Sequence, residues 1–218
     1  MRQLRTLALG AALALLATAG GAGVAAGQVG KNNGVLNPDL ASEAELAALP
    51  GLNAATAKAI LAAKPFMNMT EFNAFLEKQG LSVEQRTALW PKLFLPINLL
   101  SASDEEILMV PGAGRRMLRE FKEYRPYKGG LAVWRKEIGK YVDAAEVARL
   151  EQYVFVPVDL NTASDEDILS IPGAGRRMVR EFKEYRPWKT KEQFEKEIGK
   201  YVGPKETARL WTYVVIVP

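Results

Sequence analysis

Residues 111–126 read PGAGRRMLREFKEYRP, and residues 172–187 read PGAGRRMVREFKEYRP. The two stretches agree at 15 of 16 positions, so one unit is duplicated. The same spacing carried backwards places Pro50-Gly51-Leu52-Asn53 under Pro111-Gly112-Ala113-Gly114. A period of this length predicts a repeat protein. The chain therefore contains three repeats, the first of them divergent, with approximate limits of 36–96, 97–157 and 158–218.

Each repeat is punctuated as four short helices, so the predicted fold class is all-α. Ser42, Ser103 and Ser164 each precede an acidic residue three positions on, which is the capping-box arrangement. A Pro-Gly pair stops this first helix soon afterwards. In the second and third repeats the later helices are expected at 114–124 and 175–185, at 131–138 and 193–198, and at 144–153 and 205–213. The matching pieces of the first repeat cover 70–78 and 83–90.

Residues 1–27 have the pattern of a signal peptide. A positive start with Arg2 and Arg5 precedes an apolar run at 7–17, and small residues at 17–19 or 24–26 offer cleavage sites. The alternative is an uncleaved anchor, since residues 7–26 form about 20 apolar or small residues, enough to cross a bilayer. We therefore expect a periplasmic or secreted protein that contacts the membrane only if this segment is retained.

Composition excludes most enzyme classes. The 218 residues include no Cys and no His, which removes thiol nucleophiles, disulfides, Cys/His zinc sites and imidazole-based triads. We expect a non-catalytic protein with no cofactor and no metal site. Without Arg2 and Arg5 the 29 basic residues become 27, against 25 acidic ones. Net charge then argues neither for nor against nucleic acid, so any relevant electrostatics must be local.

The hairpin after the first helix is the element with binding chemistry. Its glycines allow a tight reversal and let an external group approach the bare backbone. Unpaired N–H groups at the start of the next helix, with the positive end of the helix dipole, favour an anion such as phosphate. Arginines follow at once, and a basic ridge at helical spacing would track a nucleic-acid backbone. The candidate residues are Gly112, Ala113, Gly114, Arg115, Arg116 and Arg119 with Lys122, and Gly173, Ala174, Gly175, Arg176, Arg177 and Arg180 with Lys183.

This pattern resembles the helix-hairpin-helix fold. More narrowly, VDLNTAS at 158–164 followed by IPGAG at 171–175 is similar to the exported competence DNA receptor (ComEA) family. In that family a signal or anchor precedes a double helix-hairpin-helix domain that binds double-stranded DNA without sequence preference during uptake. The resemblance implies three tandem double helix-hairpin-helix repeats. It also implies that the hairpin amides of Gly112, Ala113 and Gly114, and of Gly173, Ala174 and Gly175, meet phosphates.

The resemblance further implies a second, weaker hairpin near Gly139-Lys140 and near Gly199-Lys200. The first repeat departs from the pattern, because Asn53 replaces the second glycine and no arginine follows. We expect that repeat to be structural or a spacer.

Other interpretations of the same residues remain open. The glycines also suit a turn with no ligand, and Glu120, Glu123, Glu181 and Glu184 interleave with the basic ridge as on a solvated face. The alternative function is a protein-protein interaction module with an envelope partner, similar to the extrinsic helix-hairpin-helix subunit of photosystem II (PsbU). The tryptophans recur at helix ends, which favours packing over stacking on bases; they are Trp90, Trp134, Trp188 and Trp211.

Overall fold

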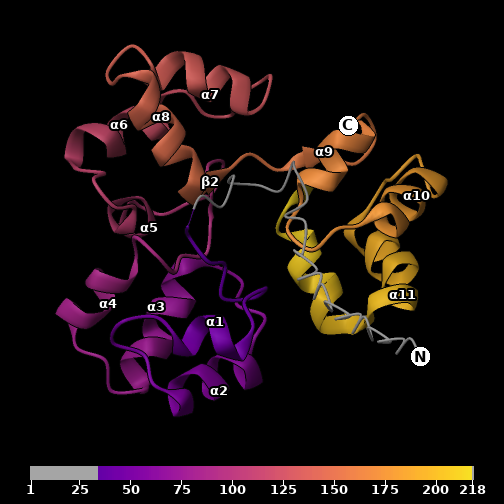
Figure 1. Ribbon diagram of the computed structural model, residues 1–218. Helices are drawn as coiled ribbons and strands as arrows, with labels where there is room; N and C mark the ends of the chain where they lie inside the picture. The colour runs from indigo at the N-terminus through magenta and orange to yellow at the C-terminus, as the bar shows by residue number, and fades with distance from the viewer. Residues whose placement is uncertain (1–33, 218) are drawn as a thin grey trace, which may run out of the picture.

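A computed structural model describes residues 34–217 (Figure 1). Residues 34–217 form eleven α-helices, one short 3-10 helix and four strands of two residues each. The fold is therefore all-α, as the helical punctuation predicts. The expected signal peptide or anchor at 1–27 lies outside the described residues. Within 34–217, no helix combines the length and the apolar character needed to cross a membrane.

The helices group by repeat (Figure 1). The first repeat contains α1 (Glu43–Ala47), α2 (Ala54–Ala63), α3 (Met69–Lys78) and α4 (Val83–Leu89). The second contains α5 (Asp104–Met109), α6 (Arg115–Glu123), α7 (Leu131–Ile138) and α8 (Ala144–Leu150), which runs on into a 3-10 turn at Glu151–Tyr153. The third contains α9 (Asp165–Ser170), α10 (Arg176–Glu184) and α11 (Lys191–Trp211).

The predicted capping boxes are confirmed at the start of α1, α5 and α9. In each, the serine hydroxyl accepts from the amide three residues on, and that residue's carboxylate accepts from the serine amide. At Ser103, for example, these bonds are 3.1 and 3.0 Å long. The first turn of each short helix is therefore satisfied locally, which explains why so short a helix forms.

The third repeat differs from the predicted helix pattern. Its third helix begins at Lys191 rather than 193, because the Thr190 side chain caps it by accepting from the Gln193 amide. The helix then continues through 199–200 to a kink at Gly203, whose φ is +77°. Two helices are thus joined end to end in α11, and the bend lies at Gly203 rather than at 199–200.

Short parallel pairings of extended segments close the repeats, which the sequence did not indicate. A single bridge joins Leu36 to Leu93. Strand β1 (Ile97–Asn98) pairs with β2 (Val154–Phe155), and β3 (Val158–Asp159) pairs with β4 (Val214–Val215). The junction segments beside Pro96 and Pro157 are extended because residues before proline avoid the helical region. Their buried backbone groups then need partners, and the far end of the same repeat provides them.

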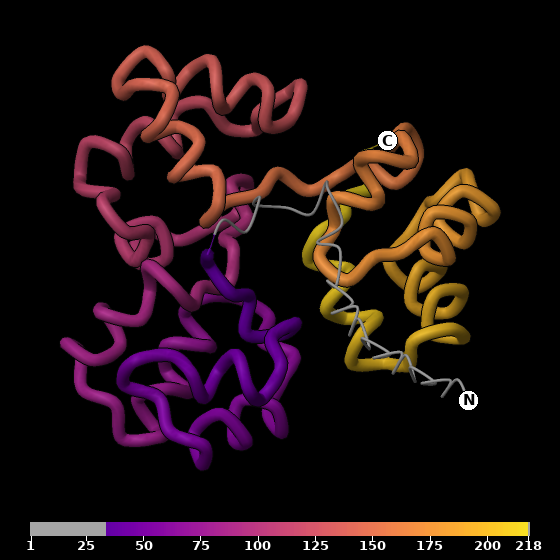
Figure 2. The backbone as a smooth tube through the Cα atoms, viewed as in Figure 1, coloured from indigo at the N-terminus to yellow at the C-terminus, as the bar shows by residue number. Residues whose placement is uncertain are grey.

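The first two repeats share one hydrophobic core, whereas the third has its own. Buried residues from Val35 to Val154 form one continuous cluster, and those from Phe155 to Val214 form another. Across the first junction, the rings of Phe94 and Tyr153 meet edge to face with centroids 5.1 Å apart. Figure 2 shows that the chain passes to the third repeat once, through an extended segment after β2. The tryptophans at 134 and 188 are fully buried, in agreement with packing rather than base stacking.

Candidate nucleic-acid interface

The two glycines of each Pro-Gly-Ala-Gly hairpin have different backbone conformations. Gly112 and Gly173 have φ of +83° and +80°, so the reversal itself requires glycine there. Gly114 and Gly175 have φ of −100° and −109° and are the N-caps of α6 and α10. A Cβ placed on either would meet no atom within 4 Å. Neither a positive φ nor a crowded neighbour therefore requires glycine at 114 and 175, although glycine is also a common N-cap residue.

The hairpin amides are not all available to a ligand. The Ala113 amide donates to the Val110 carbonyl at 2.8 Å, and the Ala174 amide donates to the Ile171 carbonyl at 2.9 Å. The expectation that these two alanine amides meet phosphates is therefore wrong, because the tight turn uses them internally. Among residues 34–217, no acceptor lies on the amides of Gly112 or Gly114, and no side chain caps α6.

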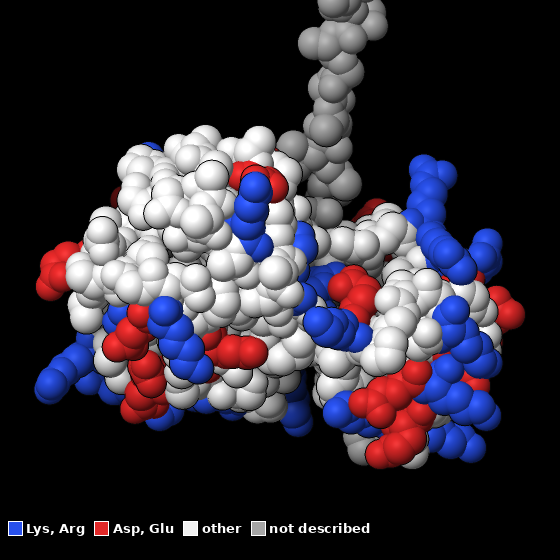
Figure 3. Space-filling model, turned by 90° about the horizontal axis from the view of Figure 1, so that it is seen from below, with Lys and Arg blue, Asp and Glu red and all other residues white. Residues whose placement is uncertain are grey.

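The first repeat satisfies the same helix start internally. The Asn53 side chain caps α2 by accepting from the Thr56 amide at 2.8 Å. Ala54 and Ala55 stand where the later repeats have paired arginines. The first hairpin therefore has the shape of the others, but a side chain caps its helix and the paired arginines are missing. Figure 3 shows a mostly uncharged face on this repeat at the left, with Lys, Arg, Asp and Glu gathered on the third repeat at the right.

The paired arginines take separate roles. The guanidinium carbon of Arg116 lies 5.0 Å from the centroid of the Tyr141 ring, and that of Arg177 lies 4.9 Å from the Tyr201 centroid. Arg115 and Arg176 are exposed, and no acidic side chain within residues 34–217 forms an ion pair with either. All four arginines are exposed, and in each hairpin the second of the two also lies over a tyrosine ring.

The predicted basic ridge is half neutralised. Lys122 bonds Asp104 at 2.6 Å, and Lys183 bonds Asp165 at 2.5 Å. Arg119 and Arg180 approach the glutamates that follow them, at 3.6 and 2.8 Å. Among the arginines and lysines of the predicted site, these ion pairs leave Arg115, Arg116 and their copies without an acidic partner within residues 34–217.

The glutamates of the ridge are not all on a solvated face. Glu120 and Glu181 are only 3% and 1% exposed, whereas Glu123 and Glu184 are exposed. The hydrogen bond from Arg180 lowers the pKa of Glu181. The interleaved pattern therefore divides into two exposed acids and two acids beneath the ridge.

The second, weaker hairpin expected near Gly139-Lys140 and near Gly199-Lys200 differs between the two repeats. In the second repeat Gly139 ends α7, and Asp143 caps α8 by accepting from the Glu146 amide at 2.8 Å. In the third repeat Gly199 and Lys200 lie inside α11, and the two helices that make up α11 meet at Gly203 instead. The ammonium groups of Lys140 and Lys200 lie 5.6 and 5.5 Å from the ring centroids of Tyr124 and Tyr185.

Two arginines that sequence reasoning missed brace the hairpins from behind. The Arg149 Nη2 donates to the Pro111 carbonyl at 2.7 Å, and the Arg209 Nη2 donates to the Pro172 carbonyl at 2.7 Å. Each also pairs with the glutamate three residues before it. The shared Glu-x-x-Arg-Leu sequence in both repeats was the available indication.

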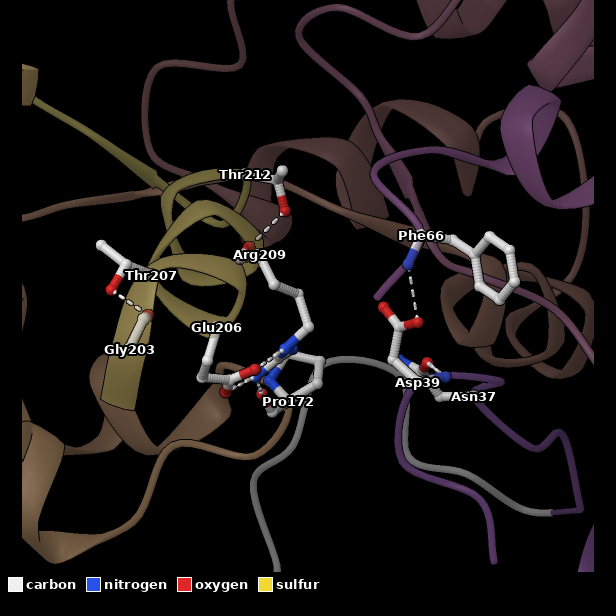
Figure 4. A network of polar contacts seen from close by, with 9 residues as sticks. All are labelled: Asn37, Asp39, Phe66, Pro172, Gly203, Glu206, Thr207, Arg209 and Thr212. Carbon is white, nitrogen blue, oxygen red and sulfur yellow. Dashed lines mark hydrogen bonds and ion pairs between the residues drawn. The ribbon is translucent and has the colours of Figure 1, made fainter. Parts of the chain in front are cut away.

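The Pro-Gly-Ala-Gly hairpins of the second and third repeats differ in their surroundings. The Arg149 side chain is 35% exposed, but the Arg209 side chain is only 2% exposed. The reason is that the start of the first repeat packs on the third hairpin: the Leu40 side chain lies 3.3 Å from a Cβ built on Gly173. Asp39 lies on the first-repeat side of this contact and Arg209 on the other (Figure 4). Within the described residues, no segment covers the Pro-Gly-Ala-Gly hairpin of the second repeat in this way.

Within residues 34–217, no group of three or more acidic side chains is arranged to hold a metal ion. The chain matches no family model, no curated protein and no solved structure.

Proposed function

We propose that this chain is an exported, non-catalytic protein of tandem double helix-hairpin-helix repeats that binds double-stranded DNA without sequence preference. The hairpins of the second and third repeats would contact duplex phosphates. Gly114 and Gly175 support the proposal most directly. Neither backbone strain nor neighbouring atoms account for glycine there, whereas close approach of an external anion does.

The chemistry at each hairpin suits a phosphate. Free amides at the start of a nine-residue helix add to the positive end of its dipole. Arg115 and Arg176 add open guanidinium groups, which bind phosphate oxygens in a bidentate manner. Amides and phosphate-directed arginines read the backbone and not the base edges, so the binding would not depend on sequence. Two hairpins on one chain increase avidity where both reach one duplex.

The test is fluorescence-polarisation binding of a random-sequence duplex over a series of salt concentrations. We expect log affinity to fall linearly with log salt, with a slope of about 0.9 per phosphate contacted. Replacing Arg115, Arg116, Arg176 and Arg177 with alanine should abolish this binding. The matched control removes four lysines from the first repeat, namely Lys58, Lys64, Lys78 and Lys92, so that the net charge changes equally. Equal loss in both variants, or unchanged affinity in the arginine variant, would contradict the proposal.

One observation favours the alternative, a structural interaction module with an envelope protein partner. The ion pairs of Lys122 and Lys183 neutralise part of each ridge, which weakens its attraction for a polyanion. If the folded protein binds no duplex even at low salt, this alternative replaces the first. A stoichiometric partner recovered from the envelope, and retained after nuclease treatment, would then identify the function.

A further inference from the structure

A carboxylate and two tyrosines form the same cluster beneath the ridge in the second and third repeats. Glu120 lies on α6, Tyr124 ends that helix, and Tyr141 comes from the turn before α8. The two tyrosine hydroxyls are 2.9 Å apart. In the third repeat, Tyr185 and Tyr201 repeat this distance of 2.9 Å above Glu181. We call each cluster a tyrosine pair with its glutamate.

Two cations lie on each tyrosine pair, and they come from different turns. Arg116 follows the Pro-Gly-Ala-Gly hairpin and lies over Tyr141, while Lys140 precedes α8 and lies over Tyr124. The third repeat places Arg177 and Lys200 in the same way, at 4.9 and 5.5 Å from the centroids of the corresponding rings. A cation over an aromatic ring is held by the ring's negative face. The Lys140 ammonium also pairs with Glu137, and the Lys200 ammonium pairs with Glu197. The arginine is therefore the cation of each cluster without an acidic partner among residues 34–217.

The glutamate adds to this arrangement. In both copies one carboxylate oxygen, Oε2, is buried and has no hydrogen-bond partner among the described residues. The hydrogen bond with Tyr124 and the nearby Glu120 carboxylate raise the pKa of Tyr141. The buried negative charge beneath the rings increases the attraction for the cations above them.

The fold does not require this cluster. At the corresponding positions, the first repeat has Ala55, Ala59, Ala63 and Gly80 in place of Arg116, Glu120, Tyr124 and Tyr141. The hairpin and the following helix nevertheless form there, with φ of +88° at Gly51 and with α2 running the full length of α6. All the members are absent together from the repeat in which a side chain caps the helix after the hairpin.

We propose that the tyrosine pairs are positioning residues for phosphate binding. They hold Arg116 and Arg177 beside the hairpins, so that each guanidinium is already in place when a phosphate binds. This inference rests on the proposed function. Its physical basis is that an arginine already held in place loses less side-chain entropy when it binds, so affinity rises without an added contact.

The experiment is a double-mutant cycle on the full chain with the random-sequence duplex. Tyr141→Leu with Tyr201→Leu removes the rings, and Tyr141→Phe with Tyr201→Phe retains them. We expect the leucine changes to weaken binding roughly tenfold and the phenylalanine changes to restore most of that loss. In a background of Arg116→Ala and Arg177→Ala, the leucine changes should have little further effect. The melting temperature of each variant shows that it is folded.

The outcomes separate this inference from the proposed function. If the unaltered chain binds no duplex, both are overturned. If it binds and the arginine variant weakens binding, but the leucine changes have no effect or act equally in both backgrounds, only the positioning role is overturned. Should the leucine variants fail to fold, Tyr124→Ala with Tyr185→Ala tests the same role, because the first repeat folds with Ala63 at that position.

Discussion

Gly112 and Gly114 are close neighbours in the sequence, yet glycine serves a different purpose at each. The first has a positive φ, and a Cβ there would lie 2.6 Å from the Arg149 Nη2. The second has an extended φ and open space around it. Asn53, at the matching position of the first repeat, shows that an amide side chain fits this conformation and caps the helix. Stability and binding therefore place separate demands on neighbouring glycines.

Replacing Gly114 and Gly175 with asparagine should separate these two demands. We expect the melting temperature to stay equal or rise slightly, since an asparagine cap is worth a few tenths of a kcal/mol over glycine. Duplex affinity should fall roughly tenfold, because the new side chain accepts from an amide that would otherwise meet phosphate. Fluorescence polarisation and thermal unfolding measure the two effects. The comparison variant, Gly112→Ala, should instead destabilise the fold by about 1–3 kcal/mol. Unchanged affinity in the asparagine variant would count against phosphate contact at these amides.

At the scale of the elements, near-identical sequences form different connections. In the second repeat Asp143 caps α8, and a turn separates it from α7. The third repeat has Gly203 at the equivalent position, followed by Pro204, and its two helices are joined in α11. Proline is favoured in the first turn of a helix, so Pro204 restarts the helix directly after the left-handed Gly203. One glycine and one proline thus convert a turn into a kink.

Two glycines of α11 should respond to alanine with opposite sign. Gly203→Ala forces a side chain into a positive φ of +77° and should destabilise the third repeat by about 1–3 kcal/mol. Gly199→Ala lies within the helix, where its Cβ would meet only the Thr207 Oγ1 at 3.7 Å, and should stabilise it by up to about 1 kcal/mol. Urea unfolding followed by circular dichroism compares them. If both alanine substitutions changed the free energy of unfolding with the same sign, the expected difference between Gly203 and Gly199 would be contradicted.

At the scale of the whole molecule, the first repeat contacts the third hairpin and leaves the second uncovered. The Asp39 Oδ1 accepts from the Phe66 amide at 2.9 Å, within the first repeat. Its Oδ2 and the Arg209 Nη1 are both buried, and neither has a hydrogen-bond partner among the described residues. Two opposite charges therefore face each other across the contact without a direct bond (Figure 4). Two hairpins with almost the same sequence are consequently not equivalent in the folded chain.

This contact predicts a pH dependence of stability. Burial raises the pKa of Asp39 to about 6, against the opposing effects of the Phe66 amide and the charge of Arg209. In the unfolded chain the Asp39 carboxyl has its ordinary pKa of 3.8. As the pH rises, the unfolded chain therefore loses this proton before the native state does. The native state therefore binds the extra proton between these values, and stability falls as the pH rises towards 6, by up to about 3 kcal/mol.

Asp39→Asn should remove this dependence, since the amide oxygen still accepts from Phe66 and no proton is exchanged. We expect the difference in urea midpoint between about pH 4.5 and about pH 7.5 to become smaller in this variant. Glu105→Gln changes an exposed acid and serves as the control. We expect this variant to keep the pH response of the unaltered chain. An unaltered response in Asp39→Asn would show that this carboxyl is not the group responsible.

Local features could be predicted from the sequence. The serine caps, the stop at Pro-Gly, the positive φ of Gly112 and the bounds of α7 all follow from residues close to one another in the chain. Helix caps and tight turns are made of hydrogen bonds over that short range, so a short stretch of sequence specifies them.

The sequence by itself determined the helical class, the capped starts of the first helices and the positions of the Pro-Gly turns. Only the tertiary structure decided that Glu120 is buried, that Arg149 braces the distant Pro111, and that Leu40 lies on Gly173 while the second hairpin is open. The physical reason is that burial and charge pairing depend on which distant segments pack together. Near-identical local sequences cannot record that difference, because the neighbour that covers one copy is absent from the other.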